Sequence, residues 1–186
     1  MHNNTLVTGS LADIAQAKNI SLAESFLTAD AIIIIDVSAS MRQTDGKKRT
    51  RYERACQELE KLQANLPGKL AVVAFASSVQ FCPGGVPVFL SSATDLAKAL
   101  EFIKPADGCG LKFIIISDGE PDSETAALSV AQQFESSLDT VYLGPEGGPG
   151  QDFLRRLSAA SGGRAVRHGA AELNQLSSSV KLLLTT

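Results

Sequence analysis

The sequence predicts an α/β fold, a Rossmann-like three-layer α/β/α sandwich with one central sheet. The first observation is that strand-like and helix-like segments alternate along most of its 186 residues. The second is that the most apolar segments are short β-branched runs, which is typical of strands buried on both faces of a parallel sheet. With 44% hydrophobic and 20% charged residues, the chain can bury a core large enough for one globular domain.

Six strands are expected, and they form a mostly parallel sheet. Residues 31–35 are the clearest strand, because an unbroken run of isoleucines ends at Asp36. The run at 86–90 contains Pro87, which cannot donate a hydrogen bond to a neighbouring strand, so this run is predicted as the one antiparallel edge strand. The six predicted strands are 31–35, 70–75, 86–90, 113–116, 140–143 and 164–166.

Five helices are expected between and after these strands. Segment 52–66 carries leucines at helical spacing and stops at Pro67-Gly68. Segment 94–103 opens with Thr94-Asp95, a pair suited to helix capping; Thr94 resembles a cap, and Asp95 is predicted to cap the helix or to support the site rather than to be a ligand. The other predicted helices are 123–138, 152–160 and 171–184.

The residues before the first strand carry two capping signals. Ser10 is followed three residues later by Asp13, and Ser21 by Glu24, so each pair resembles the capping box that opens a helix. We therefore expect residues 1–29 to be a short helical extension packed on a domain formed by residues 30–186.

Charge and cysteine content argue against several classes of function. A net charge of -3 gives no electrostatic case for nucleic acid or an anionic membrane, and the basic run at 47–51 is predicted to be a solvated loop. The longest apolar run, 31–35, is too short to cross a bilayer, and we expect no secretory signal. Cys56, Cys82 and Cys109 lack CxxC spacing and indicate free thiols, so a cytoplasmic location is expected.

Oxygen-bearing side chains follow two of the predicted strands. The strand at 31–35 is followed by Asp36, Ser38 and Ser40, and the strand at 113–116 by Asp118. In open α/β sheets, ligands bind beyond the carboxyl ends of the strands, where the strand order reverses. If these two strands are neighbours, their polar side chains meet in one crevice.

These side chains favour a hard divalent cation. Carboxylates and hydroxyls suit Mg²⁺ or Mn²⁺, and no histidine or cysteine lies near either motif. His2 and His168 are far apart in the sequence and are predicted to be surface residues rather than ligands.

The segment Asp36-Val-Ser38-Ala-Ser40 resembles the DxSxS signature of the metal-ion-dependent adhesion site in von Willebrand factor A (VWA) domains. Thr94, Asp118 in Ile-Ser-Asp-Gly-Glu-Pro, and a Gly-rich loop at 144–150 follow in the order typical of that family. The resemblance covers about residues 30 to 184 and is to the stand-alone intracellular bacterial and phage members.

The resemblance implies that Ser38 and Ser40 bind the cation directly, that Thr94 binds directly or through water, and that Asp36 and Asp118 act mainly through waters. Mostly neutral direct ligands would leave the charge of the cation incompletely balanced. An Asp or Glu of a protein partner is then expected to complete the coordination. Family members of this type often work beside AAA-type ATPases or in multi-protein assemblies, so the implied function is that of an adaptor.

Three alternatives stay open at this point. The polar residues could serve only as turn and cap residues, or a bound metal could only stabilise a structural subunit. A metal-dependent phosphoryl-transfer enzyme could use Asp36 as its nucleophile. Phosphatases with an aspartate nucleophile resemble a DxDxT pattern, however, and Ser38 stands at the position of its second Asp. The sequence has no GxxxxGK[ST] loop either, so we expect a protein that is not an enzyme.

Overall fold

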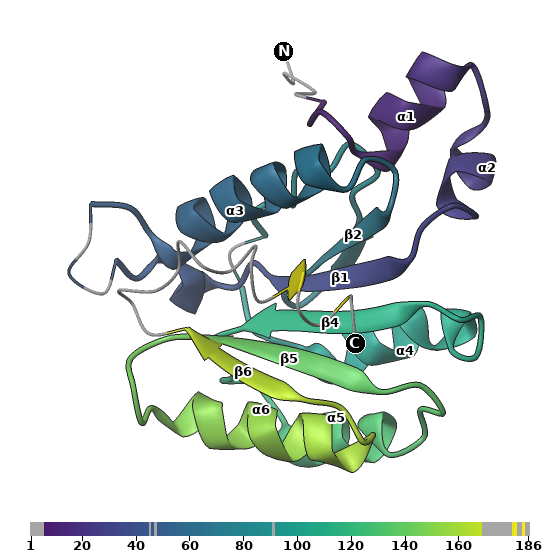
Figure 1. Cartoon of the computed structure of the whole chain (residues 1–186). Coiled ribbons are helices and arrows are strands. Elements are labelled where there is room, and N and C mark those ends of the chain that lie inside the picture. The colour runs from purple at the N-terminus through teal and green to yellow at the C-terminus, as the bar shows by residue number, and fades with distance from the viewer. Residues whose placement is uncertain are drawn as a thin grey trace.

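The computed structural model describes residues 6–44, 46, 48–90, 92–168, 180, 181 and 184. It shows a six-stranded sheet with helices on both faces, which confirms the predicted three-layer architecture (Figure 1). The strand order is β3-β2-β1-β4-β5-β6, and only the β2–β3 pair is antiparallel. The strands are β1 (Ala31–Asp36), β2 (Leu70–Phe75), β3 (Val79–Phe81), β4 (Lys112–Ser117), β5 (Leu138–Leu143) and β6 (Ala165–His168).

Burial on both faces explains why β1 is a continuous apolar run. Ile33 and Ile35 belong to the core under α3 (Arg51–Asn65), whereas Ile32 and Ile34 face the opposite core. That second core is covered by α4 (Leu96–Ile103), α5 (Glu124–Ala131) and α6 (Pro149–Ala160). Each fully buried isoleucine contributes about 1.5–3 kcal/mol to folding, so the central strand anchors the whole sheet.

The antiparallel edge strand lies at Val79–Phe81 and not at 86–90, where it was predicted. Only three residues link β2 to β3, so the chain folds straight back and pairs with β2. Val79 and Phe81 pack on the core while Gln80 is exposed, the alternation of a half-buried strand. Segment 86–90 forms no strand, because Pro87 lacks a donor and its neighbours Val86 and Val88 are 40% and 45% exposed.

Capping explains where α3 begins. The Thr50 hydroxyl accepts a hydrogen bond from the backbone N–H of Glu53 (3.1 Å), and the Glu53 carboxylate accepts one from the backbone N–H of Thr50 (2.8 Å). This reciprocal capping box fixes the first turn, and it makes Arg51 the first residue of the helix. Of the Thr94-Asp95 pair, Asp95 is the residue that caps α4, because its side chain accepts from the backbone N–H of Lys98 (3.0 Å).

Helix α5 ends at Ala131, well short of the predicted end at 138. The Phe134 ring packs edge-on against Phe113, with 5.7 Å between centroids, which pulls the chain into the core. The Asp107 carboxylate accepts hydrogen bonds from the backbone N–H groups of Glu135 and Ser136 (both 2.9 Å). These non-local contacts replace the helical hydrogen bonds that the sequence pattern suggested.

Two short helices, α1 (Leu11–Lys18) and α2 (Leu22–Phe26), precede the sheet, with Ser10 and Ser21 as their N-caps. Two 3-10 turns, η1 (Ala39–Arg42) and η2 (Lys104–Ala106), follow β1 and α4. His2 and most of the predicted helix at 171–184 lie outside the described residues. Among the residues that the structure describes, no helix is long and apolar enough to cross a membrane.

Candidate metal centre

The sheet topology brings the two predicted motifs to one place. β1 and β4 are parallel neighbours, and their register pairs Ile35 with Ile116, so Asp36 lies beside Ser117. From β1 the chain passes through α3 to β2 on one side, and it later returns through α4 to β4 on the other side. The site is therefore at the point where the strand order reverses, as the sequence predicted.

Asp36 is completely buried, and hydrogen bonds hold both of its carboxylate oxygens. Its Oδ1 accepts from the backbone N–H of Ser38 (2.9 Å), and its Oδ2 accepts from the hydroxyl of Ser117 (2.6 Å). The Ser117 hydroxyl in turn accepts from the backbone N–H of Gly119 (2.9 Å). Ser117 was not among the predicted site residues. The sequence feature that could have identified it is its position at the end of β4, directly before Asp118.

Ser38 and Ser40 place their hydroxyl oxygens side by side, 3.0 Å apart. Ser38 is in extended conformation immediately before η1, and its side chain does not cap that turn. Ser38 is 1% exposed and Ser40 is half-buried, so the pair lies at the boundary between the core and the surface. Two convergent hydroxyls at this boundary suit a cation that also reaches solvent.

Thr94 is joined to the site through the backbone. Its N–H donates to Oδ1 of Asp122 (3.0 Å), and its carbonyl accepts from the N–H of Asp122 (2.9 Å). Nearby, the N–H of Ala39 donates to the carbonyl of Ser92 (3.3 Å). The loops that follow β1 and β4 and the loop that precedes α4 are therefore tied together. Asp122 precedes α5, and its side chain holds the backbone of Thr94.

Asp118 forms a buried ion pair that the sequence did not reveal. Its Oδ2 accepts from Nη1 of Arg51 at 3.1 Å, and the two side chains are 1% and 5% exposed. Arg51 was predicted to belong to a solvated basic loop, which is wrong for this residue. The capping box places it at the start of α3, where its side chain reaches the carboxyl end of β4.

The second oxygen of Asp118 is left without a partner. Its Oδ1 is buried and accepts no hydrogen bond from any residue that the structure describes. A buried carboxylate oxygen without a partner costs free energy, so a ligand that contacts it would stabilise the folded protein.

Two carboxylates near each other raise the cost of ionising both. Burial, followed by repulsion from Asp118, raises the pKa of Asp36 to about 6. Asp36, Asp118 and Arg51 together carry one net negative charge at neutral pH, and a divalent cation would reverse that sign. The residues present therefore fit a hard divalent cation, which Asp36, Ser38, Ser40, Thr94 and Asp118 would hold. Among the described residues, this site included, no three His, Cys, Asp or Glu side chains form a group that could hold a metal ion, so the fit here depends on hydroxyls beside two carboxylates.

Glycines let the Gly-rich loop approach the site. Gly119 has φ of +75°, and a Cβ there would lie 2.2 Å from the carbonyl oxygen of Gly150. A Cβ on Gly150 would lie 2.0 Å from the carbonyl oxygen of Asp118. Only glycines fit this contact between the chain after β4 and the first turn of α6, so the loop contributes backbone packing next to Asp118.

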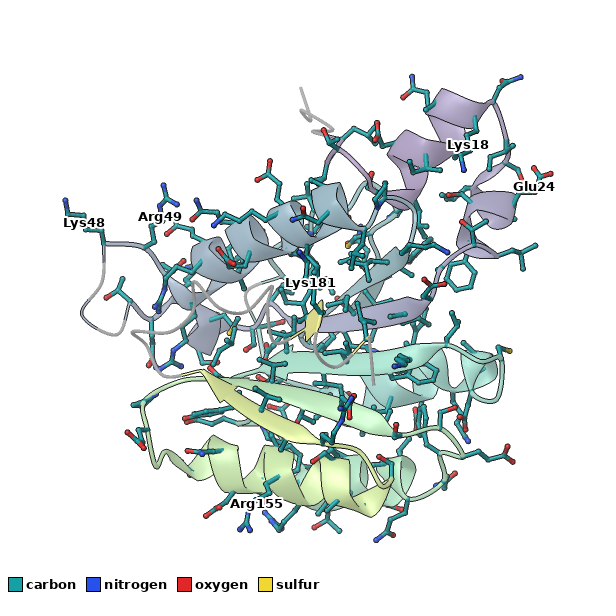
Figure 2. All side chains as sticks on the ribbon, viewed as in Figure 1. Lys18, Glu24, Lys48, Arg49, Arg155 and Lys181 are labelled. Atoms are coloured by element: carbon teal, nitrogen blue, oxygen red, sulfur yellow. The ribbon has the colours of Figure 1, made fainter. Side chains whose placement is uncertain are left out.

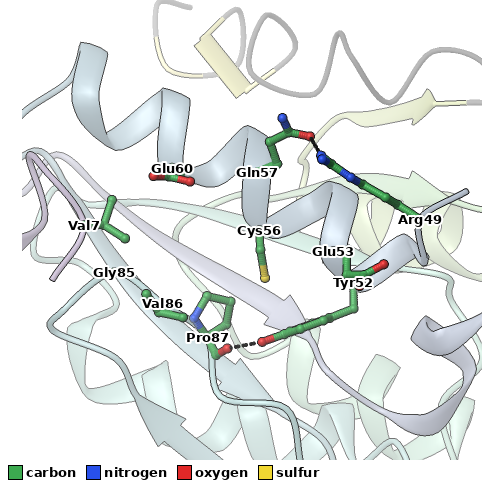
Figure 3. Close-up of a pocket in the computed structure, with 10 residues that line it drawn as sticks. All are labelled: Val7, Arg49, Tyr52, Glu53, Cys56, Gln57, Glu60, Gly85, Val86 and Pro87. Atoms are coloured by element: carbon green, nitrogen blue, oxygen red, sulfur yellow. Dashed lines mark hydrogen bonds between the residues drawn. The ribbon is translucent and has the colours of Figure 1, made fainter. Parts of the chain in front are cut away.

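A groove of about 520 Å³ lies between α3 and residues 85–87, and Figure 3 shows its lining side chains. The Tyr52 hydroxyl donates to the carbonyl of Pro87 (2.7 Å) across one end. Burial raises the pKa of the Cys56 thiol to about 11, so this thiol stays protonated at neutral pH. The groove therefore offers no thiolate nucleophile at neutral pH.

Comparison with protein-family models and with curated proteins gives no match to the sequence. Comparison with solved structures shows that the fold is VWA-like. An aerotolerance-related membrane protein from Bacteroides fragilis, crystallised with multiple mutations to serine, aligns with a TM-score of 0.66 and 14% identity over 84% of this chain and 98% of that chain. BatB from Bacteroides thetaiotaomicron aligns with a TM-score of 0.58 and 15% identity over 85% and 100%.

The manganese-loaded TRAP protein of Plasmodium vivax is a third structural neighbour, with a TM-score of 0.57 and 13% identity over 84% of this chain and 74% of that chain. At these identities the likeness is one of fold. Of these three neighbours of similar fold, the TRAP protein is the one described as manganese-loaded.

Proposed function

We propose that this chain is a divalent-metal-dependent protein-binding module with a metal-ion-dependent adhesion site of the VWA type. The cation is Mg²⁺ or Mn²⁺, and its ligands are Asp36, Ser38, Ser40, Thr94 and Asp118. A protein partner contributes an Asp or Glu to the same cation. The partner class is an AAA-type ATPase or another component of a multi-protein assembly, in which this chain acts as an adaptor.

The observation that carries the proposal is the unpartnered, buried Oδ1 of Asp118 at the same sheet edge as the paired hydroxyls of Ser38 and Ser40. A cation bound there would satisfy the carboxylate that the protein leaves unpaired. It would also offset the repulsion that raises the pKa of Asp36.

The need for an outside carboxylate follows from charge. With Arg51 beside Asp118, the loaded site carries a net positive charge instead of being neutral. The site is mostly buried but reaches solvent at Ser40. Its positive charge would attract an anionic oxygen there more strongly than it attracts water. A cation that only stabilised the fold would need no such outside ligand.

A role as an adaptor rather than an enzyme is supported by the environment of Asp36. Both of its oxygens accept hydrogen bonds from neighbouring groups, and its side chain is completely buried. A nucleophilic carboxylate in phosphoryl transfer must reach the substrate with a free oxygen. The free thiols of Cys56, Cys82 and Cys109 fit the reducing conditions of the cytoplasm, which we propose as the location.

The test is retention of partners on the immobilised, full-length chain with Mg²⁺ and with EDTA. Metal-dependent retention that the Asp36→Ala variant loses, with its melting temperature little changed, supports the adhesion-site function. Retention that EDTA does not affect indicates the structural alternative. Metal-dependent phosphatase turnover that is lost in the same variant would establish the enzyme instead.

A further inference from the structure

The loop between β1 and the first turn of α3 concentrates positive charge. Residues 42–54 contain six basic and two acidic residues, a net charge of +4 in a chain whose total is -3. The rest of the chain is therefore strongly acidic. Such an asymmetry within one short segment gives a local field whose sign is opposite to that of the molecule as a whole.

Among the described residues of this segment, three exposed cations lie between the candidate metal centre and α3: Arg42, Lys48 and Arg49, called here the basic rim. Arg42 is the last residue of η1, the turn that also contains Ser40. Figure 2 shows Lys48 and Arg49 projecting from the end of the molecule where this loop connects β1 to α3. The basic rim thus begins two residues after Ser40 and continues along the exposed loop that leads away from the site.

Arg42 is held in place rather than free to swing. Its guanidinium carbon lies 4.5 Å from the centroid of the Phe89 ring, and that ring packs against Tyr52 with 5.1 Å between centroids. Tyr52 is in turn fixed by its hydrogen bond to Pro87. An ordered cation loses less conformational entropy on binding an anion than a mobile side chain does.

The opposite flank of the site has the other sign. Glu120 and Asp122 are exposed in the segment that follows Asp118, and Glu124 opens α5 with an ion pair to Arg156. An extended polyanion such as nucleic acid, lying across the whole sheet edge, would meet these carboxylates. A short anionic segment that runs from the cation over the basic rim alone avoids them.

We infer that the partner binds through a short acidic peptide segment. One of its carboxylates completes the cation, and the carboxylates next to it pair with Arg42, Lys48 and Arg49. This inference rests on the proposed function and names the recognition chemistry of the partner. Because the rim is exposed, its pairs speed association and set specificity, and they weaken as salt rises.

The probe is a fluorescein-labelled hexaglutamate peptide, with hexaglutamine as its neutral counterpart, and binding is followed by fluorescence anisotropy in Mg²⁺ or EDTA. The test variant is Lys48→Glu/Arg49→Glu. The matched control is Lys18→Glu/Arg155→Glu, which changes the net charge by the same amount on two distant surfaces (Figure 2). Thermal melting checks that each variant folds, and Lys48→Gln/Arg49→Gln serves as a milder version.

The wild type should bind hexaglutamate in Mg²⁺ and lose it in EDTA. The Lys48→Glu/Arg49→Glu variant should bind about tenfold more weakly, whereas the control variant should stay within about twofold of wild type at physiological salt. Equal losses in both variants would overturn the basic rim as the docking surface. Tighter binding of a labelled oligothymidylate than of hexaglutamate would point to nucleic acid and overturn the peptide assignment.

The same measurements distinguish an error in the proposed metal-dependent function from an error in the acidic-segment inference. If the Lys48→Glu/Arg49→Glu variant is weakened but EDTA has no effect on the wild type, the metal-dependent function is wrong, and so is the anchoring of the peptide at the cation. If EDTA abolishes binding and the rim variant is unaffected, the metal-dependent function stands and only the acidic-segment inference fails.

Discussion

The guanidinium of Arg51 lies against the carboxylate of Asp118, with 3.1 Å between Nη1 and Oδ2, and both side chains are buried. Arg51 is the first residue of α3, and Asp118 directly follows the last residue of β4. The protein therefore supplies an internal positive charge beside a proposed metal ligand. This arrangement weakens the attraction for a cation and strengthens the attraction for an anion once the cation is bound.

Arg51→Met should raise the affinity for Mn²⁺ by about tenfold or more, because a buried positive charge beside Asp118 is removed. The metal-free variant should lose about 3–5 kcal/mol of stability, since Asp118 is left buried and unpaired. Titration calorimetry and thermal melting measure the two effects. Arg49→Met, at an exposed neighbour, should change neither, and a lower Mn²⁺ affinity in Arg51→Met would contradict the role of the ion pair.

Ser38→Ala/Ser40→Ala should abolish the binding of one Mg²⁺ or Mn²⁺ while leaving the melting temperature of the metal-free protein within a few degrees. The variant removes two hydroxyl ligands but no apolar packing. Ser77→Ala/Ser92→Ala is the matched control, because those two hydroxyls also form a close pair, 2.8 Å apart, but lie outside the proposed ligand set. Titration calorimetry that finds the same metal affinity in both variants would show that the hydroxyls of Ser38 and Ser40 are not ligands.

The metal-free protein should become less stable as the pH rises from about 4 to about 7. The pKa of Asp36 is raised to about 6, so between these values the folded protein holds a proton that the unfolded chain releases. The stabilisation is fully present below the unfolded pKa near 4 and is lost as the pH passes about 6, a difference of about 2–3 kcal/mol.

Melting of wild type and Asp36→Asn at several pH values isolates this effect, because the variant cannot titrate at residue 36. The stability of the wild type relative to Asp36→Asn should be highest at low pH and should decrease as the pH rises to neutral. Metal affinity should rise over the same window, since a proton on Asp36 competes with the cation. A pH-independent difference would show that Asp36 does not titrate there.

Thr94→Ala should weaken partner capture more than it weakens metal affinity, if the threonine changes its ligation when a partner docks. The backbone of Thr94 is held by Asp122, so the loop itself should stay in place. Asp95→Ala is the control: it removes the α4 cap in the same loop at a cost of about 1 kcal/mol but no proposed ligand. Equal losses of capture in the two variants, measured with and without Mg²⁺, would assign the effect to the loop rather than to the hydroxyl.

The fold class and the position of the candidate site could be predicted because their signals are local. A strand buried on both faces must be apolar at every residue, and residues 31–35 show this without reference to anything else in the chain. Polar residues that directly follow such a strand must lie at the sheet edge, so Asp36, Ser38 and Asp118 were placed correctly at the carboxyl ends of β1 and β4. Their role as metal ligands stays a prediction.

Tertiary structure decided the features that depend on residues distant in the sequence. The edge strand is β3 because a short turn lets Val79–Phe81 reach β2, whereas Pro87 prevents pairing at 86–90. Arg51 is buried because the capping box at Thr50 aims it at a carboxylate 67 residues away. The sequence by itself determined the five parallel strands and which loops carry oxygen-bearing side chains, since burial and chain direction act over a few residues. The charge balance of the site was decided only by folding, since it depends on which distant groups come within hydrogen-bonding distance.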